Sequence, residues 1–299
     1  MAQPAQPPPP ASFLEQFIKF GTDAYGLERI LRFFQSIAAL LLFSAPFRTV
    51  SSLLLLPLVN PWALSSFSSA PLKPPASPLL DPAAAAVLHP LRSRLTSLRQ
   101  ALRLFRFLES FSAAWEVWNA LGRDSDRRSR RETAQLWADL GAKMFMGIYL
   151  LLESAVFVEV VLGVPFEVGV WGSRERVGEL VMDGQRFWFG GLVCGVVVGI
   201  LKLCQGGAEK EEKEEKKKKG EKDAATVKRD GGRKTIVRRL AADAMDLALP
   251  GSAVGWLPLG PETVAWLMLG STILTGMEIW ERCGREVAAA KRRAAGAAN

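Results

Sequence analysis

The sequence predicts an all-α fold, namely a helical integral membrane protein with amphipathic interfacial helices and two to three apolar, membrane-associated helices. Hydrophobic residues make up 49% of the 299 residues, although 23% are charged. The two classes are segregated into long apolar blocks and intervening charged runs. Such segregation is typical of membrane proteins, whereas a soluble domain spreads its apolar residues in short periodic runs.

Composition also divides the chain. Residues 1–11 are Pro-rich and are expected to be disordered, residues 12–280 to form a single membrane domain, and residues 281–299 to form a basic tail. Within the membrane domain, residues 60–90 are rich in Pro, Ser and Ala, which indicates a loop. Residues 205–235 are rich in Glu and Lys, which favours a disordered loop, with a helix through Glu–Lys pairs at four-residue spacing as the alternative.

The first helix is predicted to begin at Ser12, because Ser12 and Glu15 form the pattern of a capping box. Apolar residues then recur at alternating spacings of four and three as far as Phe34, which places them on one helical face. The charged residues Lys19, Asp23, Glu28, Arg29 and Arg32 lie elsewhere around the helix. Gly21 and Gly26 weaken its middle, at roughly 1 kcal/mol each.

The next apolar stretch, residues 37–59, is interrupted by Pro46, Arg48 and Pro57. These interruptions favour a buried or interfacial helix pair over a full membrane span.

A long amphipathic helix is predicted from Leu91 to Leu121. Projected at about 100° per residue, its leucines and Phe105 share an arc of about 80°, and four arginines share a neighbouring arc of about 60°. The apolar set is Leu91, Leu95, Leu98, Leu102 and Phe105, and the basic set is Arg92, Arg99, Arg103 and Arg106. Basic residues beside an apolar face suit a helix that lies among lipid headgroups. The alternative is a helix packed on the protein with its arginines in water.

Three apolar blocks follow. Met144–Val164 has the length of a membrane span, but Glu153 and Glu159 must then face other helices or water. Phe187–Leu201 is free of acidic residues, and Thr263–Trp280 ends in a basic tail.

The second of these blocks contains Gly191, Gly195 and Gly199. Small residues at four-residue spacing let helices approach closely in lipid, so this strip predicts helix packing, either between copies of the chain or within one chain.

The net charge of +8 points to an acidic partner, and anionic membrane lipids are favoured over nucleic acid because the basic residues lie beside apolar blocks. No nucleophile elbow and no Cys/His cluster occurs in the sequence. We therefore expect no enzyme activity, no catalytic residue, no cofactor and no metal.

Three blocks together resemble the peroxisomal biogenesis factor 11 family, in a fungal-like form. They are FIKFGTDAYGLERILRFFQ (Phe17–Gln35), SLRQALRLFRFLE (Ser97–Glu109) and RRLAADAMDLALPGSAVGWLPL (Arg238–Leu259). In the first block, Leu27-Glu28-Arg29 stands where the family often has a more polar Arg-Asp-Lys. In the third block, Asp243, Asp246, Pro250, Gly255 and Trp256 match the family's C-terminal pattern.

The resemblance implies a protein of the peroxisomal membrane that elongates and tubulates the membrane before fission, and so regulates peroxisome number and size. It also implies self-association as a homo-oligomer and recruitment of fission machinery, and it places the membrane-remodelling helix at Leu91–Phe111. Two other functions stay open at this point. One is a solute channel or transporter lined by Glu153 and Glu159, and the other is a tether between organelles that uses the Glu/Lys-rich segment.

Overall fold

A computed structural model of the chain describes residues 12–44, 47, 82–123, 128–161, 169–216 and 224–297. These residues form helices and connecting turns, without a strand among them, so the all-α prediction is confirmed. In chain order the helices are α1 (Phe13–Thr22), α2 (Ala24–Phe43), α5 (Pro82–Leu102), α6 (Arg106–Gly122), α7 (Arg130–Ala155), α8 (Phe157–Val161), α9 (Arg174–Lys216), α10 (Ala224–Asp246), α11 (Ala248–Val254) and α12 (Pro261–Ala297).

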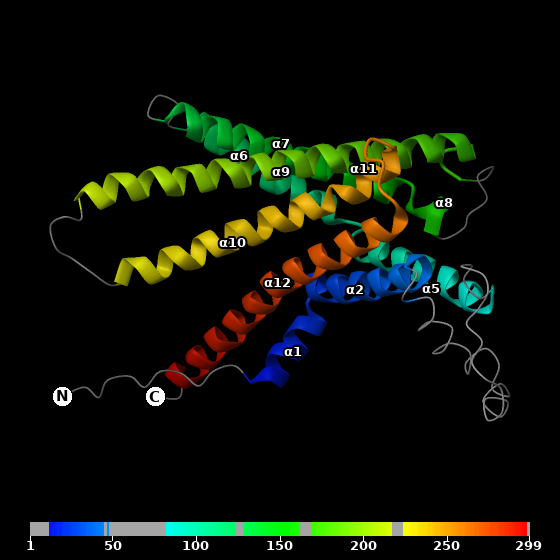
Figure 1. Cartoon of the computed structure of the whole chain (residues 1–299), viewed down its shortest axis with the longest axis horizontal. Coiled ribbons are helices and arrows are strands. Elements are labelled where there is room, and N and C mark those ends of the chain that lie inside the picture. Colours follow the sequence, from blue (N-terminus) through cyan, green and yellow to red (C-terminus); the bar gives the residue numbers. More distant parts are fainter. Residues whose placement is uncertain are drawn as a thin grey trace.

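The long helices pack in a circuit. Helix α2 contacts α5 and α12, α10 contacts α12 and α9, and α7 contacts α9 and α6. Because α6 follows α5 after a short turn, these contacts close the helices into a ring. Figure 1 shows α6, α7 and α9 along one side, α2 and α5 along the other, and α10 and α12 between them. The interior of this circuit holds the charged residues described below.

The first predicted helix is two helices in the structure. Ser12 caps α1 through the capping box with Glu15, as the sequence predicts. The chain then turns at Asp23, whose backbone is extended and whose carboxylate accepts hydrogen bonds from the backbone N–H groups of Tyr25 and Gly26. An aspartate in this position satisfies N–H groups that a helix start leaves free. Asp23 therefore ends α1 and begins α2.

The predicted helix from Leu91 to Leu121 is also divided. Helix α5 ends at Leu102 and α6 begins at Arg106, and backbone hydrogen bonds between them join residues three apart. The Ser154 hydroxyl of α7 donates to the Leu104 carbonyl at this point. The turn is thus fixed by a partner on another helix that the local sequence does not show.

The predicted apolar helix Met144–Val164 does not run unbroken either. Helix α7 ends at Ala155, Val156 leaves the helical conformation, and α8 ends at Val161. Phe187–Leu201 lies within α9 and Thr263–Trp280 within α12, as continuous helix. Among the described helices, α9 over Arg174–Gln205 is long and apolar enough to cross a membrane by length and composition.

Two predicted loop segments contain helix. The end of the 60–90 segment forms the first turns of α5, because Pro82 suits the first position of a helix and four alanines follow it. Helix α9 extends to Lys216 and α10 begins at Ala224, so most of residues 205–235 is helical. The backbone of the described part of this segment is therefore helical, as in the alternative given above. The stretch between residues 48 and 81 lies outside the described residues.

The glycine strip of α9 lies against neighbouring helices of the same chain. A Cβ on Gly191 would stand 3.3 Å from the Ala142 carbonyl oxygen of α7. A Cβ on Gly195 would stand 3.2 Å from Asp243, and one on Gly199 would stand 3.0 Å from Leu240, both of α10. The strip therefore packs α9 within the chain, which is one of the two roles that the sequence left open.

We expect Gly191→Leu to destabilise the protein by about 1–3 kcal/mol, because the added side chain meets the α7 backbone and cannot displace it cheaply. Gly178→Leu, on the same helix but with open space at its Cβ, is the matched control and should leave stability unchanged or raise it slightly. Thermal unfolding in detergent, followed by circular dichroism, measures both. Equal midpoints for the two variants would contradict the close packing of α9 on α7.

Candidate membrane surface and its ionic core

A buried carboxylate, Glu28 of α2, lies at the centre of a group of arginines. Its side chain is 1% exposed, and its oxygens lie 3.1 Å from Arg99 Nη2 of α5, 3.2 Å from Arg29 Nη2 and 3.6 Å from Arg106 Nη1 of α6. Gln35, about two helical turns further along α2, accepts a hydrogen bond from Arg99. One carboxylate thus connects α2 with both α5 and α6.

The electrostatics follow from this geometry. Burial alone would raise the pKa of Glu28, but the Arg29 and Arg99 guanidiniums outweigh it, so its pKa lies well below the usual range. Burial lowers the pKa of Arg99 to about 10, which still leaves it charged at neutral pH. The cluster is therefore ionic under physiological conditions.

Two further ion pairs extend this ionic core to the other helices. Arg32 of α2 forms a bidentate ion pair with Asp246 at the end of α10. It also donates a hydrogen bond of 3.3 Å to the Ser271 hydroxyl of α12. Arg103, in the turn after α5, lies 2.8 Å from Glu153 of α7. Together with Glu28, these contacts join α2, α5, α6, α7 and α10 through charged side chains and reach α12 through the Ser271 hydroxyl.

The outer side of α5 and α6 has the opposite character. Large apolar side chains are exposed at Leu91, Leu98, Phe105, Leu108 and Trp115, and the last three are 69%, 59% and 64% exposed. We call these five residues the outer stripe. In this part of the protein Arg99 and Arg103 thus lie inside, whereas the outer stripe is exposed together with the charged residues Arg94, Glu109 and Glu116.

This arrangement corrects the expected positions of several predicted residues. Arg99 and Arg103, expected beside lipid headgroups, lie inside among Glu28, Gln35 and Glu153, because a buried carboxylate holds each of them. Arg106 is partly buried against Glu28, with its guanidinium 4.1 Å from the centre of the Tyr25 ring.

The other predicted residues divide between the two sides. Leu95 is buried and Leu102 is half-buried, whereas Leu91, Leu98 and Phe105 are exposed. Arg92 is partly buried, with its guanidinium 5.4 Å from the centre of the Phe43 ring.

The two carboxylates expected to line a channel, Glu153 and Glu159, both accept hydrogen bonds from other groups of the protein. Glu153 accepts hydrogen bonds from Arg103 and from the Tyr149 hydroxyl. Glu159 is buried and accepts the backbone N–H of Trp171. These contacts fix both side chains inside the protein, so neither supports the channel as a path-lining group.

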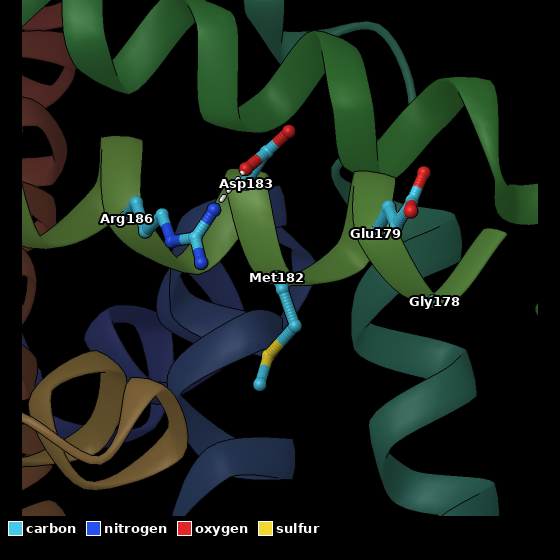
Figure 2. A pocket seen from close by; sticks show the side chains of 5 residues that line it. All are labelled: Gly178, Glu179, Met182, Asp183 and Arg186. Carbon is cyan, nitrogen blue, oxygen red and sulfur yellow. Dashed lines mark hydrogen bonds and ion pairs between the residues drawn. The ribbon is translucent and has the colours of Figure 1, made fainter. Parts of the chain in front are cut away.

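A hollow at the start of α9 is lined by Gly178, Glu179, Met182, Asp183 and Arg186 (Figure 2). Asp183 and Arg186 form an exposed ion pair at 2.6 Å within the helix. The hollow is open to the surface, and its charged groups come from successive turns of one helix, which gives it no converging set of polar groups. Among the described residues there is also no cluster of side chains suited to a metal ion.

Glu28 was missed as a central residue by the sequence analysis, which placed it off the apolar face of its helix without a partner. The surplus of arginines on the following amphipathic segment was the available signal, because buried arginines require carboxylates.

We expect Glu28→Gln to lower the free energy of unfolding by about 3–5 kcal/mol near neutral pH, since it leaves three arginines around a neutral group. A carboxyl whose pKa is lowered on folding stabilises the protein above its unfolded pKa of about 4.3, and this contribution is lost as the pH falls below that value. The difference between variant and wild type should therefore shrink below about pH 4.

Thermal midpoints measured in detergent across this pH range test the prediction. Asp183→Asn, which breaks an exposed pair on α9, is the control and should change the midpoint little. A pH-independent difference between Glu28→Gln and wild type would contradict the role assigned to this carboxylate.

The comparisons with known proteins identify the family. No curated protein and no solved structure was found to match the chain. Residues 76–280 match the model of a family described as peroxisomal biogenesis factor 11. This match covers more than two thirds of the chain and includes α5 to α11 and most of α12. The chain belongs to the peroxisomal biogenesis factor 11 family.

Proposed function

We propose that this protein elongates and tubulates the peroxisomal membrane before fission, and thereby regulates the number and size of peroxisomes. Membership of the family supports a role in peroxisome proliferation at the peroxisomal membrane. The observation that carries the proposed mechanism is the outer stripe, which turns apolar side chains outward where α5 and α6 turn their arginines inward.

The outer stripe is costly in water and favourable in lipid. Fully burying a Leu or Phe side chain is worth about 1.5–3 kcal/mol, and contiguous exposed apolar surface usually marks an interaction site. Transfer of the Phe105, Leu108 and Trp115 side chains from water to the acyl region of a bilayer would provide this favourable free energy. The arginines on the inner side meanwhile keep their carboxylate partners.

Shallow insertion supplies the curvature. Helices that enter the headgroup and upper acyl region displace lipid in one leaflet, and many copies favour a curved, tubular membrane. Arg92 and Arg94 are the basic residues of α5 outside the ionic core, and they would be the ones to meet anionic headgroups. The sequence-based expectation gave this role to Arg92, Arg99, Arg103 and Arg106, and among these four Arg92 lies outside the ionic core.

We further propose that α9 anchors the protein as an integral membrane protein. The most apolar stretch of 18 residues within Arg174–Gln205 has a mean hydropathy of 2.0, and 17% of its residues are buried inside the protein. Val193, Val197 and Ile200 are exposed along that stretch and can face lipid.

Self-association as a homo-oligomer and contact with the fission machinery are part of the same proposal, supported by the family. Because Gly191, Gly195 and Gly199 already face α7 and α10, association between copies would use another surface. Crosslinking in proteoliposomes at several protein densities tests self-association, and monomers at every density would count against it.

We expect the double variant Leu98→Glu, Leu108→Glu to lose tubulation of anionic liposomes by the reconstituted full-length protein. A carboxylate in place of each exposed leucine cannot enter the acyl region without a large desolvation cost. Ser93→Glu, which adds a carboxylate at an exposed polar position of α5, is the matched control and should keep the activity.

Electron microscopy of the liposomes and counts of peroxisomes in cells that express each variant measure the effect. Unaltered tubules with the double variant, at equal incorporation into the bilayer, would rule out insertion of the outer stripe.

A further inference from the structure

Helix α7 carries its charges on one side. Projected at about 100° per residue, the charged residues that follow Arg130 share an arc of about 120°. They are Arg131, Glu132, Asp139, Lys143 and Glu153. Glu153 belongs to the ionic core through its contact with Arg103, and Asp139 and Lys143 pair with each other at 2.5 Å. This side of α7 is therefore turned toward the interior of the ring of helices.

The opposite side of α7 is apolar and exposed. Met144 lies nine residues before Glu153, so the two side chains project on opposite sides of the helix. Trp137 and Leu151 each lie seven residues from Met144, which places all three along one line. All three side chains are exposed. Mean hydropathy along the sequence does not reveal this side, because it averages these residues with the charged ones.

Helix α9 continues the apolar side of α7. The two helices pack on each other, and Val193 and Val197 of α9 are exposed. A Cβ on Gly190, one helical turn before Val193, would stand 3.3 Å from the ring of Phe145, which directly follows Met144. The exposed residues of α7 and α9 therefore border the same edge of the contact between the two helices.

Helix α6 packs along the other flank of α7 (Figure 1). Trp115 of the outer stripe lies nine residues from Arg106, so it projects away from the ionic core, as Met144 does. Trp118, one turn further, contacts the Trp137 ring of α7 with the ring centroids 6.1 Å apart, and both rings are exposed. The outward sides of α6, α7 and α9 thus join into one apolar surface.

We call this surface the three-helix face. It consists of Trp115, Trp137, Met144, Leu151, Val193 and Val197.

Charged residues mark the ends of the three-helix face. Arg123 and Arg130 flank the α6–α7 connection at one end. Both are exposed, and neither forms an ion pair with any residue that the structure describes. At the other end, near the start of α9, lies the exposed pair of Asp183 and Arg186 (Figure 2). Between that pair and Lys202, α9 has no charged residue.

We propose that lipid acyl chains cover the three-helix face, so that α7 is embedded in the bilayer beside α9. Trp137 lies at the level of the headgroups, Arg123 and Arg130 bind headgroup phosphates, and Met144 and Leu151 lie among the acyl chains. This proposal deepens the proposed function: it rests on the anchoring through α9 and adds α7 as a second membrane-embedded helix.

The order of residues along α7 and α9 favours a bilayer over a second copy of the chain as the occupant. The charged residues stand at the ends of the face, and Trp118 and Trp137 lie beside the cations of one end. Helices that pass from headgroups into acyl chains have this order. An interface between proteins has its polar rim around the whole patch. Continuity with the candidate span of α9 supports the same occupant.

A dye on a single cysteine of the full-length protein tests this proposal. An environment-sensitive dye is attached to Met144→Cys on the three-helix face, or to Ser93→Cys at an exposed polar position of α5. Cys194 and Cys204 are replaced by Ala, and Cys283 stays because it is fully buried. The proteins are reconstituted in vesicles of phosphatidylcholine and phosphatidylserine that carry a quencher on the acyl chain.

We expect the dye at position 144 to emit at shorter wavelength and to be quenched several-fold more strongly than the dye at position 93, which should remain in water. The quenching at 144 should not depend on the density of protein in the vesicles. Leu151→Cys repeats the measurement one stretch further along α7, so that a folding defect in one variant does not decide the result.

Equal, weak quenching at positions 144, 151 and 93 would overturn the proposal. So would dyes on α7 that are shielded from water, escape the lipid quencher and respond to protein density, because this result identifies a second copy as the occupant.

A dye at Val197→Cys in the same vesicles reports on α9 and separates this proposal from the one on which it rests. Quenching at 197 without quenching at 144 and 151 refutes the embedding of α7 alone. Absence of quenching at all three positions refutes the anchoring through α9 as well.

Discussion

The packing of the helices depends on one carboxylate, that of Glu28. It receives arginines from α2 itself, from α5 and from α6, so it fixes the rotation of three helical segments about their axes. Unpaired burial of any of these charges would cost several kcal/mol, which makes alternative rotations unfavourable. The pairs Arg32–Asp246 and Arg103–Glu153 extend the same constraint to α10 and α7. The exposed position of the outer stripe follows from which charges are held inside.

Burial of Arg99 and Arg103 explains how this amphipathic segment can carry several arginines and still expose the apolar side chains of the outer stripe. In a soluble bundle the outward side of such a helix would be charged and its inner side apolar. Here Leu98 and Phe105 face outward, while Arg99 and Arg103 face carboxylates. The candidate span in α9 fits the same environment, since Val193, Val197 and Ile200 are exposed along it.

Local signals predicted the elements well, and long-range contacts decided the rest. The capping box at Ser12, the continuous helix through Phe187–Leu201 and the close packing at Gly191 all followed from neighbouring residues. The break after Leu102 did not, because it depends on Ser154 and Glu153, about fifty residues further along the chain. Helical periodicity placed the arginines and the leucines of α5 on neighbouring arcs of the helix. It could not say that Arg99 is buried while Leu98 is exposed, because that depends on Glu28, 71 residues from Arg99.

The inward position of Arg99, Arg103 and Arg106 has a consequence for work with isolated fragments. A synthetic peptide spanning Leu91–Phe111 would lack Glu28 and Glu153, so its guanidiniums would be free to bind phosphates. Its affinity for anionic liposomes would then report a basic surface that the intact fold conceals. Such a fragment would overstate the electrostatic contribution to binding, and its salt sensitivity would exceed that of the whole protein.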